Sequence, residues 1–420
     1  MPFMSRLRNV GLLAAGTAVA QLVSFGVSPI LSRIYQPAEF GLLGVFVGIA
    51  AVASVVVSLR LDLAVVVPES ESDAMDVVTV GVLAVAGMTA LTTVLIVLFG
   101  DALATALGEP ELTPLLAYLP LYLGATGVFS MFNYWSTRNS RFAPLAIFES
   151  LRAITVAGIQ LGMGLLRKGV KGLVLGQVVG PIVLVLGILS VSARREPAMF
   201  RRKVSFSRAK EIVARFSNFI IYGTPQALVN SINQSLPVLV LTVTFNAGIA
   251  GYYLMAHRLI AAPISLLGRS TRQVIYPQLS RAMAAGTAFP TAIRTTFLLA
   301  AVTVLPVILV ILAGPSLFAW VLGAEWRTSG EFARFLVVWL AVAFINIPSV
   351  SLIPLLEMQR WHAIYEIFYL IARFLALVLG SRGGDPLAGI MWFAIVGIAF
   401  NLVLIYVPLR RLRRRMAHAG

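Results

Sequence analysis

The stretch Ser192–Arg215 reads SARREPAMFRRKVSFSRAKEIVAR and lies near the middle of a 420-residue chain. Its basic residues are Arg194, Arg195, Arg201, Arg202, Lys203, Arg208, Lys210 and Arg215. A dense basic cluster between long apolar segments is typical of a loop on the cytoplasmic side of a membrane. A nucleic-acid patch is the alternative, but the segments on either side are too apolar for a soluble protein. The stretch therefore predicts an N-terminal lobe at 1–192, a cytoplasmic linker at 193–215 and a C-terminal lobe at 216–420.

The composition excludes a soluble domain. Hydrophobic residues make up 59% of the chain and charged residues 12%, with a mean hydropathy of +0.91. A soluble protein needs far more polar surface. The formal net charge of +16 is concentrated at the ends of apolar segments, so we attribute it to topology and contact with anionic membrane lipids rather than to nucleic acid.

Few residues are available for catalysis or for binding a cofactor. The chain has no cysteine and three histidines, which excludes disulfides and thiol chemistry and argues against a metal centre. The sequence contains no phosphate-binding GxxxxGK[ST] loop and no nucleophile elbow. We therefore expect no cofactor and no enzymatic activity.

Apolar segments of membrane-spanning length predict an all-α polytopic protein with about 12 transmembrane helices. The expected spans are 10–31, 40–59, 77–99, 112–134, 145–166, 172–191, 216–244, 248–267, 290–313, 332–356, 361–379 and 387–409. The bias of Lys and Arg between the two sides places both termini in the cytoplasm. A cleaved signal peptide ending near Ala20 is the alternative for the first segment, but its apolar run continues to Leu31.

The seventh span is the most polar. Gln226, Asn230 and Asn233 follow a helical spacing, and Gln234 is adjacent, so four amides lie on or near one helix face. Pro225 and Pro237 flank them and predict a bent or locally unwound helix. A single amide would fit helix-to-helix contact, whereas four favour the lining of a wet cavity.

The two halves show a faint internal repeat. The segment YQPAEFG at 35–41 and the segment FNAGIAG at 245–251 each precede an apolar span, and they lie 210 residues apart. Two halves with the same orientation are what a parallel repeat about an axis along the membrane normal predicts. Transporters built in this way hold their substrate between the halves, so we expect two six-helix lobes around a central cavity.

Several charged residues lie at the expected cytoplasmic edge or inside spans. Four arginines surround the eighth span and the loop expected after it: Arg258, Arg269, Arg272 and Arg281. By the internal repeat, Arg60 and Asp62 in the first half lie opposite Arg269 and Arg272 in the second. Arginine suits phosphate because its planar fork donates two hydrogen bonds at once, and Arg138 is a further candidate. The alternative is that these arginines only set topology. Glu149 and Glu366 are candidates for ion coupling or for structural ion pairs.

Four segments resemble those of bacterial polysaccharide (O-antigen-type oligosaccharide) flippases. They read SPILSRIYQPAEFGLLGVF (28–46), SLRLDLAVVVPESESDA (58–74), STRNSRFAPLAIFESLRAITVAGIQLGMGLL (136–166) and GYYLMAHRLIAAPISLLGRSTRQVIYPQLS (251–280). This family belongs to one superfamily with multidrug exporters and peptidoglycan-precursor flippases. In this resemblance Arg33, Arg60, Asp62, Arg269 and Arg272 fall on recurrent charged positions.

The resemblance implies a function. It implies transfer of an undecaprenyl-pyrophosphate-linked oligosaccharide from the cytoplasmic to the outer leaflet of the plasma membrane by alternating access. Its implied partners are this lipid-linked oligosaccharide, a polysaccharide polymerase and glycosyltransferases. Two alternatives stay open: a cation-coupled multidrug antiporter of the same superfamily, and a membrane polysaccharide polymerase, which would have a large extracytoplasmic loop that this sequence lacks.

Overall fold

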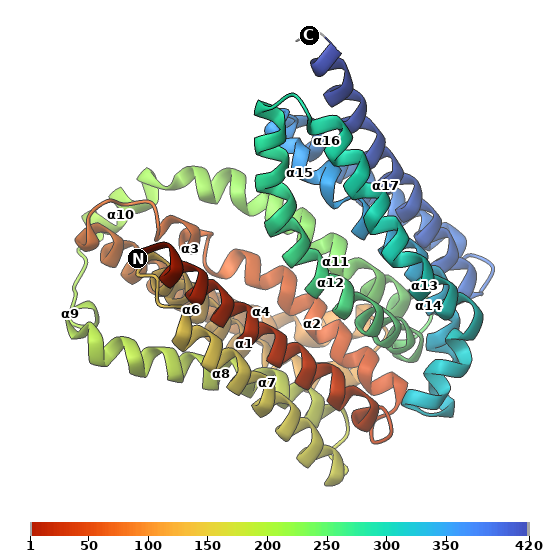
Figure 1. Ribbon diagram of the computed structural model, residues 1–420. Coiled ribbons are helices and arrows are strands. Elements are labelled where there is room, and N and C mark those ends of the chain that lie inside the picture. Colours follow the sequence, from red (N-terminus) through yellow and green to blue (C-terminus); the bar gives the residue numbers. More distant parts are fainter. Residues whose placement is uncertain (1, 418–420) are drawn as a thin grey trace. The chain divides into compact units, whose positions relative to one another are not determined.

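The computed structural model describes residues 2–417, and all regular structure in this range is helical (Figure 1). Packing divides the chain into two compact units, Met1–Ala247 and Gly248–Gly420. The helices of the first unit are α1 (Pro2–Leu31), α2 (Pro37–Val57), α3 (Leu61–Ala64), α4 (Glu71–Ala106), η1 (Pro110–Leu112), α5 (Thr113–Leu116), α6 (Leu119–Arg138), α7 (Phe142–Leu165), α8 (Val170–Arg195), α9 (Pro197–Phe200), α10 (Phe206–Arg215), the π-helical turn η2 (Phe219–Gly223) and α11 (Thr224–Thr244).

The second unit is built from longer helices. They are α12 (Ala247–Ala284), α13 (Ala288–Leu322), η3 (Ala324–Trp326), α14 (Arg327–Ile345), α15 (Ile347–Leu355), α16 (Gln359–Gly380) and α17 (Pro386–Ala417). Its core lies between α12, α13, α15, α16 and α17 and contains Leu279, Leu352 and Leu412. Gly314 and Gly330 let α13 and α14 approach closely, because a Cβ on Gly330 would lie 2.4 Å from the carbonyl oxygen of Gly314.

The chain is an all-α, multi-pass membrane protein. Nine helices within residues 2–417 are long and apolar enough to cross a membrane, and a pair bent by 46° (Pro110–Leu116 and Leu119–Arg138) raises the number to ten. The other two expected spans coincide with α1, whose apolar part is Ala18–Leu31, and with α12, which carries His257 and Arg258. The twelve expected spans thus coincide with helical structure, and three of them, 112–134, 216–244 and 332–356, each cover more than one helix.

Contacts inside the first unit agree with the expected alternation of the spans. The helix pairs α1 and α7, α7 and α8, α4 and α6, and α2 and α11 pack together. The side chain of Arg138, at the end of α6, reaches the loop before α4, and residues of α10 reach the first turns of α4. The ends of even-numbered spans therefore meet on one side of this unit, as the charge pattern requires.

The division by packing differs from the division by charge. The seventh span, α11, packs against α2, where a Cβ on Gly48 would lie 3.4 Å from the Cβ of Ser235. Packing therefore groups α11 with the preceding helices. The lobes predicted at 1–192 and 216–420 follow charge and the repeat, and that division stays a prediction. In its support, α2 and α12 begin 210 residues apart, at Pro37 and Ala247.

Two segments expected to be loops are helical. The basic stretch contains α9 and α10, and α10 is capped by Ser205, whose hydroxyl accepts a hydrogen bond from the backbone N–H of Arg208. Such a cap satisfies one of the free donors at a helix start. The loop expected after the eighth span is replaced by α12, whose 38 residues extend over about 57 Å at 1.5 Å per residue. Arg269 and Arg272 therefore lie on a continuous helix.

Candidate functional site

A sharp corner between α2 and α3 holds Arg60 and Asp62 in the first unit. Leu59 and Arg60 have φ angles of 49° and 58°, a left-handed conformation that costs about 1–3 kcal/mol for each residue other than glycine. Asp62 is 5% exposed and accepts hydrogen bonds from Ser58 (3.2 Å) and Ser130 (2.6 Å). Nε of Arg60 is buried without a hydrogen-bond partner. Hydroxyl groups, rather than an arginine, hold the Asp62 carboxylate.

Arg138 is engaged with the backbone of the loop between α3 and α4. Its guanidinium donates to the carbonyl oxygens of Glu69 (3.0 Å), Ser70 (3.4 Å) and Val65 (3.4 Å). It also lines a cavity of about 560 Å³ together with Glu69 and Asn139. These bonds hold the loop in place, so any role of Arg138 in binding substrate stays a prediction.

The amides of α11 occupy the helix face opposite α2. Ser235 packs against α2, and Gln226 lies nine residues before it, which at 3.6 residues per turn is the opposite side of the helix. Gln226, Asn230 and Gln234 are exposed, whereas Asn233 is 7% exposed. The unwinding expected between Pro225 and Pro237 is not found, because α11 is continuous from Thr224 to Thr244 with Pro237 inside it. A π-helical turn, η2, lies just before α11, and such distortions are frequent at functional sites.

Arg269 and Arg272 line one cavity in the second unit. This cavity of about 280 Å³ lies between α12 and the α14–α15 segment, and Gly268, Phe344 and Ile347 complete its wall. Both arginines are exposed. The side chains come together because they lie three residues apart on one face of α12. Two guanidinium groups at one cavity form a site that suits a phosphate-bearing ligand.

Arg33 and Arg258 lie apart from these groups. Arg33 is exposed in the turn between α1 and α2, and the 21 residues of α2 separate it from Arg60 by about 30 Å. Arg258 is half-buried on α12, eleven residues or about 16 Å before Arg269. The recurrent charged positions therefore do not converge on one site within the first unit.

Both candidate coupling carboxylates have local partners. Glu149 accepts a 2.8 Å hydrogen bond from Nε of Arg152, three residues later. Glu366 lies 3.4 Å from Nε2 of His362, four residues earlier on α16. Both arrangements match the alternative that these residues form structural ion pairs. Ion coupling by Glu149 or Glu366 stays a prediction.

The structure adds an aromatic cage that the sequence did not reveal. Arg373 on α16 is 4% exposed, and its guanidinium carbon lies 3.8 Å from the ring centroid of Phe393, 4.2 Å from that of Trp339 and 5.0 Å from that of Tyr369. Nε1 of Trp339 donates to the hydroxyl of Tyr369 over 3.1 Å. Aromatic faces stabilise a buried cation inside a membrane span. The spacing of Tyr369 and Arg373, one helical turn apart, was the available signal.

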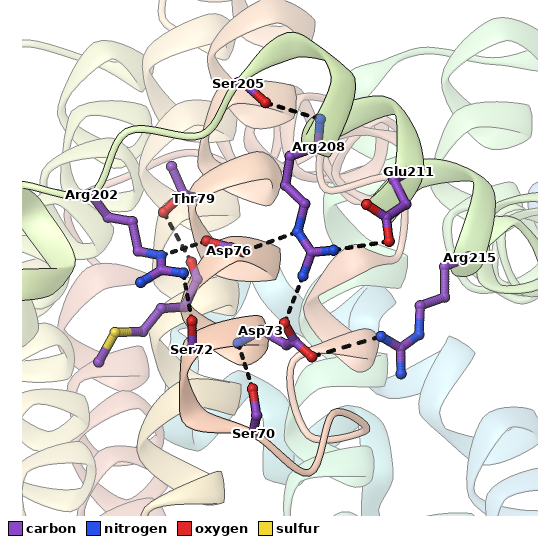
Figure 2. Close-up of polar contacts among 11 residues, drawn as sticks. Ser70, Ser72, Asp73, Asp76, Thr79, Arg202, Ser205, Arg208, Glu211 and Arg215 are labelled. Carbon is purple, nitrogen blue, oxygen red and sulfur yellow. Dashed lines mark hydrogen bonds and ion pairs between the residues drawn. The ribbon is translucent and has the colours of Figure 1, made fainter.

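A second feature missed by sequence reasoning is an ionic clamp between the basic linker and α4 (Figure 2). Arg208 contacts Asp73 (2.6 Å) and Asp76 (3.2 Å), and Arg202 donates to Asp76 over 2.5 Å. Hydrogen bonding to Asp76 raises the pKa of Arg202 above its ordinary value. Arg215 lies 3.9 Å from Asp73. The sequence signal for this contact is an acidic segment at 69–76 and a basic segment at 192–215. That the two segments pair was not predicted from the sequence.

Comparison with known proteins identifies relatives named for polysaccharide and lipopolysaccharide biosynthesis. The family described as "Polysaccharide biosynthesis protein" matches residues 30–331. Succinoglycan biosynthesis transport protein ExoT of Rhizobium meliloti (strain 1021) is 26% identical over 281 residues, covering 66% of this chain and 54% of that protein. Lipopolysaccharide biosynthesis protein WzxC of Escherichia coli (strain K12) is 23% identical over 272 residues, covering 64% of this chain and 54% of that protein. The chain thus spans about half the length of the curated relatives it matches.

Solved structures show the same fold. The lipid II flippase MurJ in an inward closed conformation aligns with a TM-score of 0.74 at 13% identity, covering 97% of this chain and 90% of that chain. An inward-facing multidrug resistance MATE family transporter of the MOP superfamily aligns with a TM-score of 0.68 at 14% identity, covering 97% and 98%. At these identities the similarity establishes the fold and leaves the transported molecule open.

Proposed function

The chain belongs to the polysaccharide biosynthesis protein family, and we propose that it is a flippase for a lipid-linked oligosaccharide. It moves an undecaprenyl-pyrophosphate-linked oligosaccharide from the cytoplasmic to the outer leaflet of the plasma (inner) membrane by alternating access. Both termini lie in the cytoplasm, the protein is not an enzyme, and polysaccharide polymerase and glycosyltransferases act before or after it.

The cavity beside Arg269 and Arg272 is the observation that supports this proposal best. A pyrophosphate carries charge that hydrocarbon cannot solvate, and two arginines on one helix face can bind it through several charge-assisted hydrogen bonds. The exposed amides Gln226, Asn230 and Gln234 supply donors and acceptors for sugar hydroxyls. The substrate's lipid tail stays in the bilayer, so only the headgroup needs a polar path.

A reconstitution assay tests the proposal. The purified chain is incorporated into liposomes that contain a short undecaprenyl-pyrophosphate oligosaccharide, and a membrane-impermeant lectin measures glycan exposed on the outside. We expect a protein-dependent increase beyond the fraction initially accessible. The same liposomes loaded with a lipophilic cationic dye test the antiporter alternative. Cation-driven dye movement without glycan exposure would refute the flippase and favour the antiporter.

A further inference from the structure

A second basic cavity lies at the junction of α12 and α13, apart from the one that Arg269 and Arg272 line. Its volume is about 990 Å³, and Arg281 and Arg294 line it from the two helices. Its other polar lining residues are Gln278, Thr287, Thr291 and Thr295. Among its described lining residues none is acidic, so the cavity carries a local excess of positive charge.

The arginines are the charged hydrogen-bond donors of the cavity. The hydroxyls of Thr291 and Thr295 donate to the carbonyl oxygens of Thr287 and Thr291, over 2.8 Å each, so their protons are already used. Nε of Arg281 donates to the carbonyl oxygen of Pro277 over 3.3 Å. That bond orients a guanidinium that has five N–H groups. Arg294 is exposed and has no acidic partner among the described residues.

The apolar side of the same cavity points to a lipid. Phe297 and Leu298 line it and are 71% and 63% exposed. They begin the apolar part of α13, a helix that is long and apolar enough to span a membrane. Arg294 lies one turn before them. Charged groups followed by exposed apolar side chains match the order of a phospholipid, whose phosphate lies at the interface and whose acyl chains lie in the hydrocarbon.

We propose that the cavity lined by Arg281 and Arg294 binds an anionic glycerophospholipid, with its phosphate between the two guanidinium groups and its acyl chains along Phe297 and Leu298. The volume suits a lipid headgroup and is within the usual range for ligand sites. Basic pockets beside membrane helices bind anionic headgroups in this way. The bound lipid bridges α12 and α13 near the hairpin at Ala285–Thr287.

Native mass spectrometry of the full chain tests the site. Phosphatidylglycerol is titrated onto the purified protein, with phosphatidylcholine as the zwitterionic comparison. In the double substitution Arg281→Gln/Arg294→Gln we expect the affinity for phosphatidylglycerol to fall about tenfold. Arg281→Lys/Arg294→Lys should retain part of the affinity, because charge remains while the planar fork is lost.

A matched control separates this site from general charge attraction. Arg411→Gln/Arg414→Gln removes the same two charges from exposed positions of α17 that lie outside the cavity, and it should change the affinity less than about twofold. Equal losses in both double variants would overturn the site. Displacement by millimolar inorganic phosphate would overturn its assignment to a lipid. If the double variant fails to fold, Arg294→Gln and Arg294→Lys give the same comparison. The readout is binding, so it is independent of flippase activity.

Discussion

The hydroxyl of Ser130 on α6 donates a 2.6 Å hydrogen bond to Oδ2 of Asp62, which lies in α3, 68 residues earlier in the chain. The other carboxylate oxygen of Asp62 accepts from Ser58. Together these bonds hold the corner where α2 ends and where Leu59 and Arg60 adopt left-handed backbone conformations. The corner therefore depends on the buried carboxylate of Asp62, each oxygen of which accepts a hydrogen bond.

Replacing Ser130 with Ala removes one of these donors. A buried carboxylate oxygen left unsatisfied costs about 1–3 kcal/mol, so the purified variant should melt at a lower temperature in detergent. Ser190→Ala is the control, because its exposed hydroxyl bonds only to its own helix, at the carbonyl oxygen of Gly187. Equal melting temperatures for Ser130→Ala and Ser190→Ala would show that the bond does not stabilise the corner.

Tyr35 provides a test that depends on pH. Its hydroxyl, in the turn between α1 and α2, donates to the carbonyl oxygen of Gln160 over 2.6 Å. Burial, reinforced by the charge of Glu39, raises the pKa of Tyr35 from 10.0 to about 12. The neutral phenol is thus favoured in the folded state, so its contribution is complete below pH 10 and is lost as the pH rises through about 12.

Tyr35→Phe should therefore be less stable than the natural protein by about 0.5–1.5 kcal/mol. The difference in thermal stability should stay constant at neutral and mildly alkaline pH and shrink above pH 10. Tyr406→Phe, at an exposed tyrosine of α17, should show neither effect. A difference that grows with alkaline pH would contradict the assignment.

The linker clamp predicts protection from proteolysis. In the variant Arg202→Ala/Arg208→Ala the buried Asp76 loses both of its ion-pair partners. An unpaired buried charge destabilises the folded state more than an exposed ion pair stabilises it. Chymotrypsin can cut at Phe206, which is 88% exposed, and we expect severalfold faster cleavage in this variant. Arg201→Ala/Lys203→Ala removes the same charge from exposed linker positions and should cleave at the natural rate. If both double variants are cut equally fast, the clamp does not restrain the linker.

The cavity on α12 predicts a graded effect on transport. Arg269→Ala and Arg272→Ala should each lower glycan exposure in the liposome assay about tenfold, because loss of one charge-assisted contact costs about 1.5–3 kcal/mol. Lys at either position should restore part of the activity. Arg382→Ala changes an exposed arginine elsewhere in the second unit and serves as the control. Normal transport by both Ala variants at normal expression would remove these arginines from the proposed site.

Some features of this protein follow from the sequence because they depend on local physics. Each apolar stretch expected to span the membrane is helical in the structure, since a chain in hydrocarbon must satisfy its backbone hydrogen bonds internally. The charge of the connecting segments predicts the side of each span end, and that orientation stays a prediction. The family-like segment at 251–280 lies within the matched residues 30–331, and the segment at 28–46 lies within them from residue 30 onward. These properties need no knowledge of which helices touch.

The pairing of side chains depended on the tertiary structure. In the sequence Asp62 lies two residues after Arg60. In the structure its carboxylate accepts hydrogen bonds from Ser58 and Ser130. Arg373 lies seven residues after Glu366 on α16, whereas the fold surrounds its guanidinium with the rings of Trp339 and Phe393. Helical periodicity determines which residues share a face, but the neighbour of that face is set by packing between helices distant in sequence. The chain alone therefore determined the helices, and only packing decided the partner of each polar group.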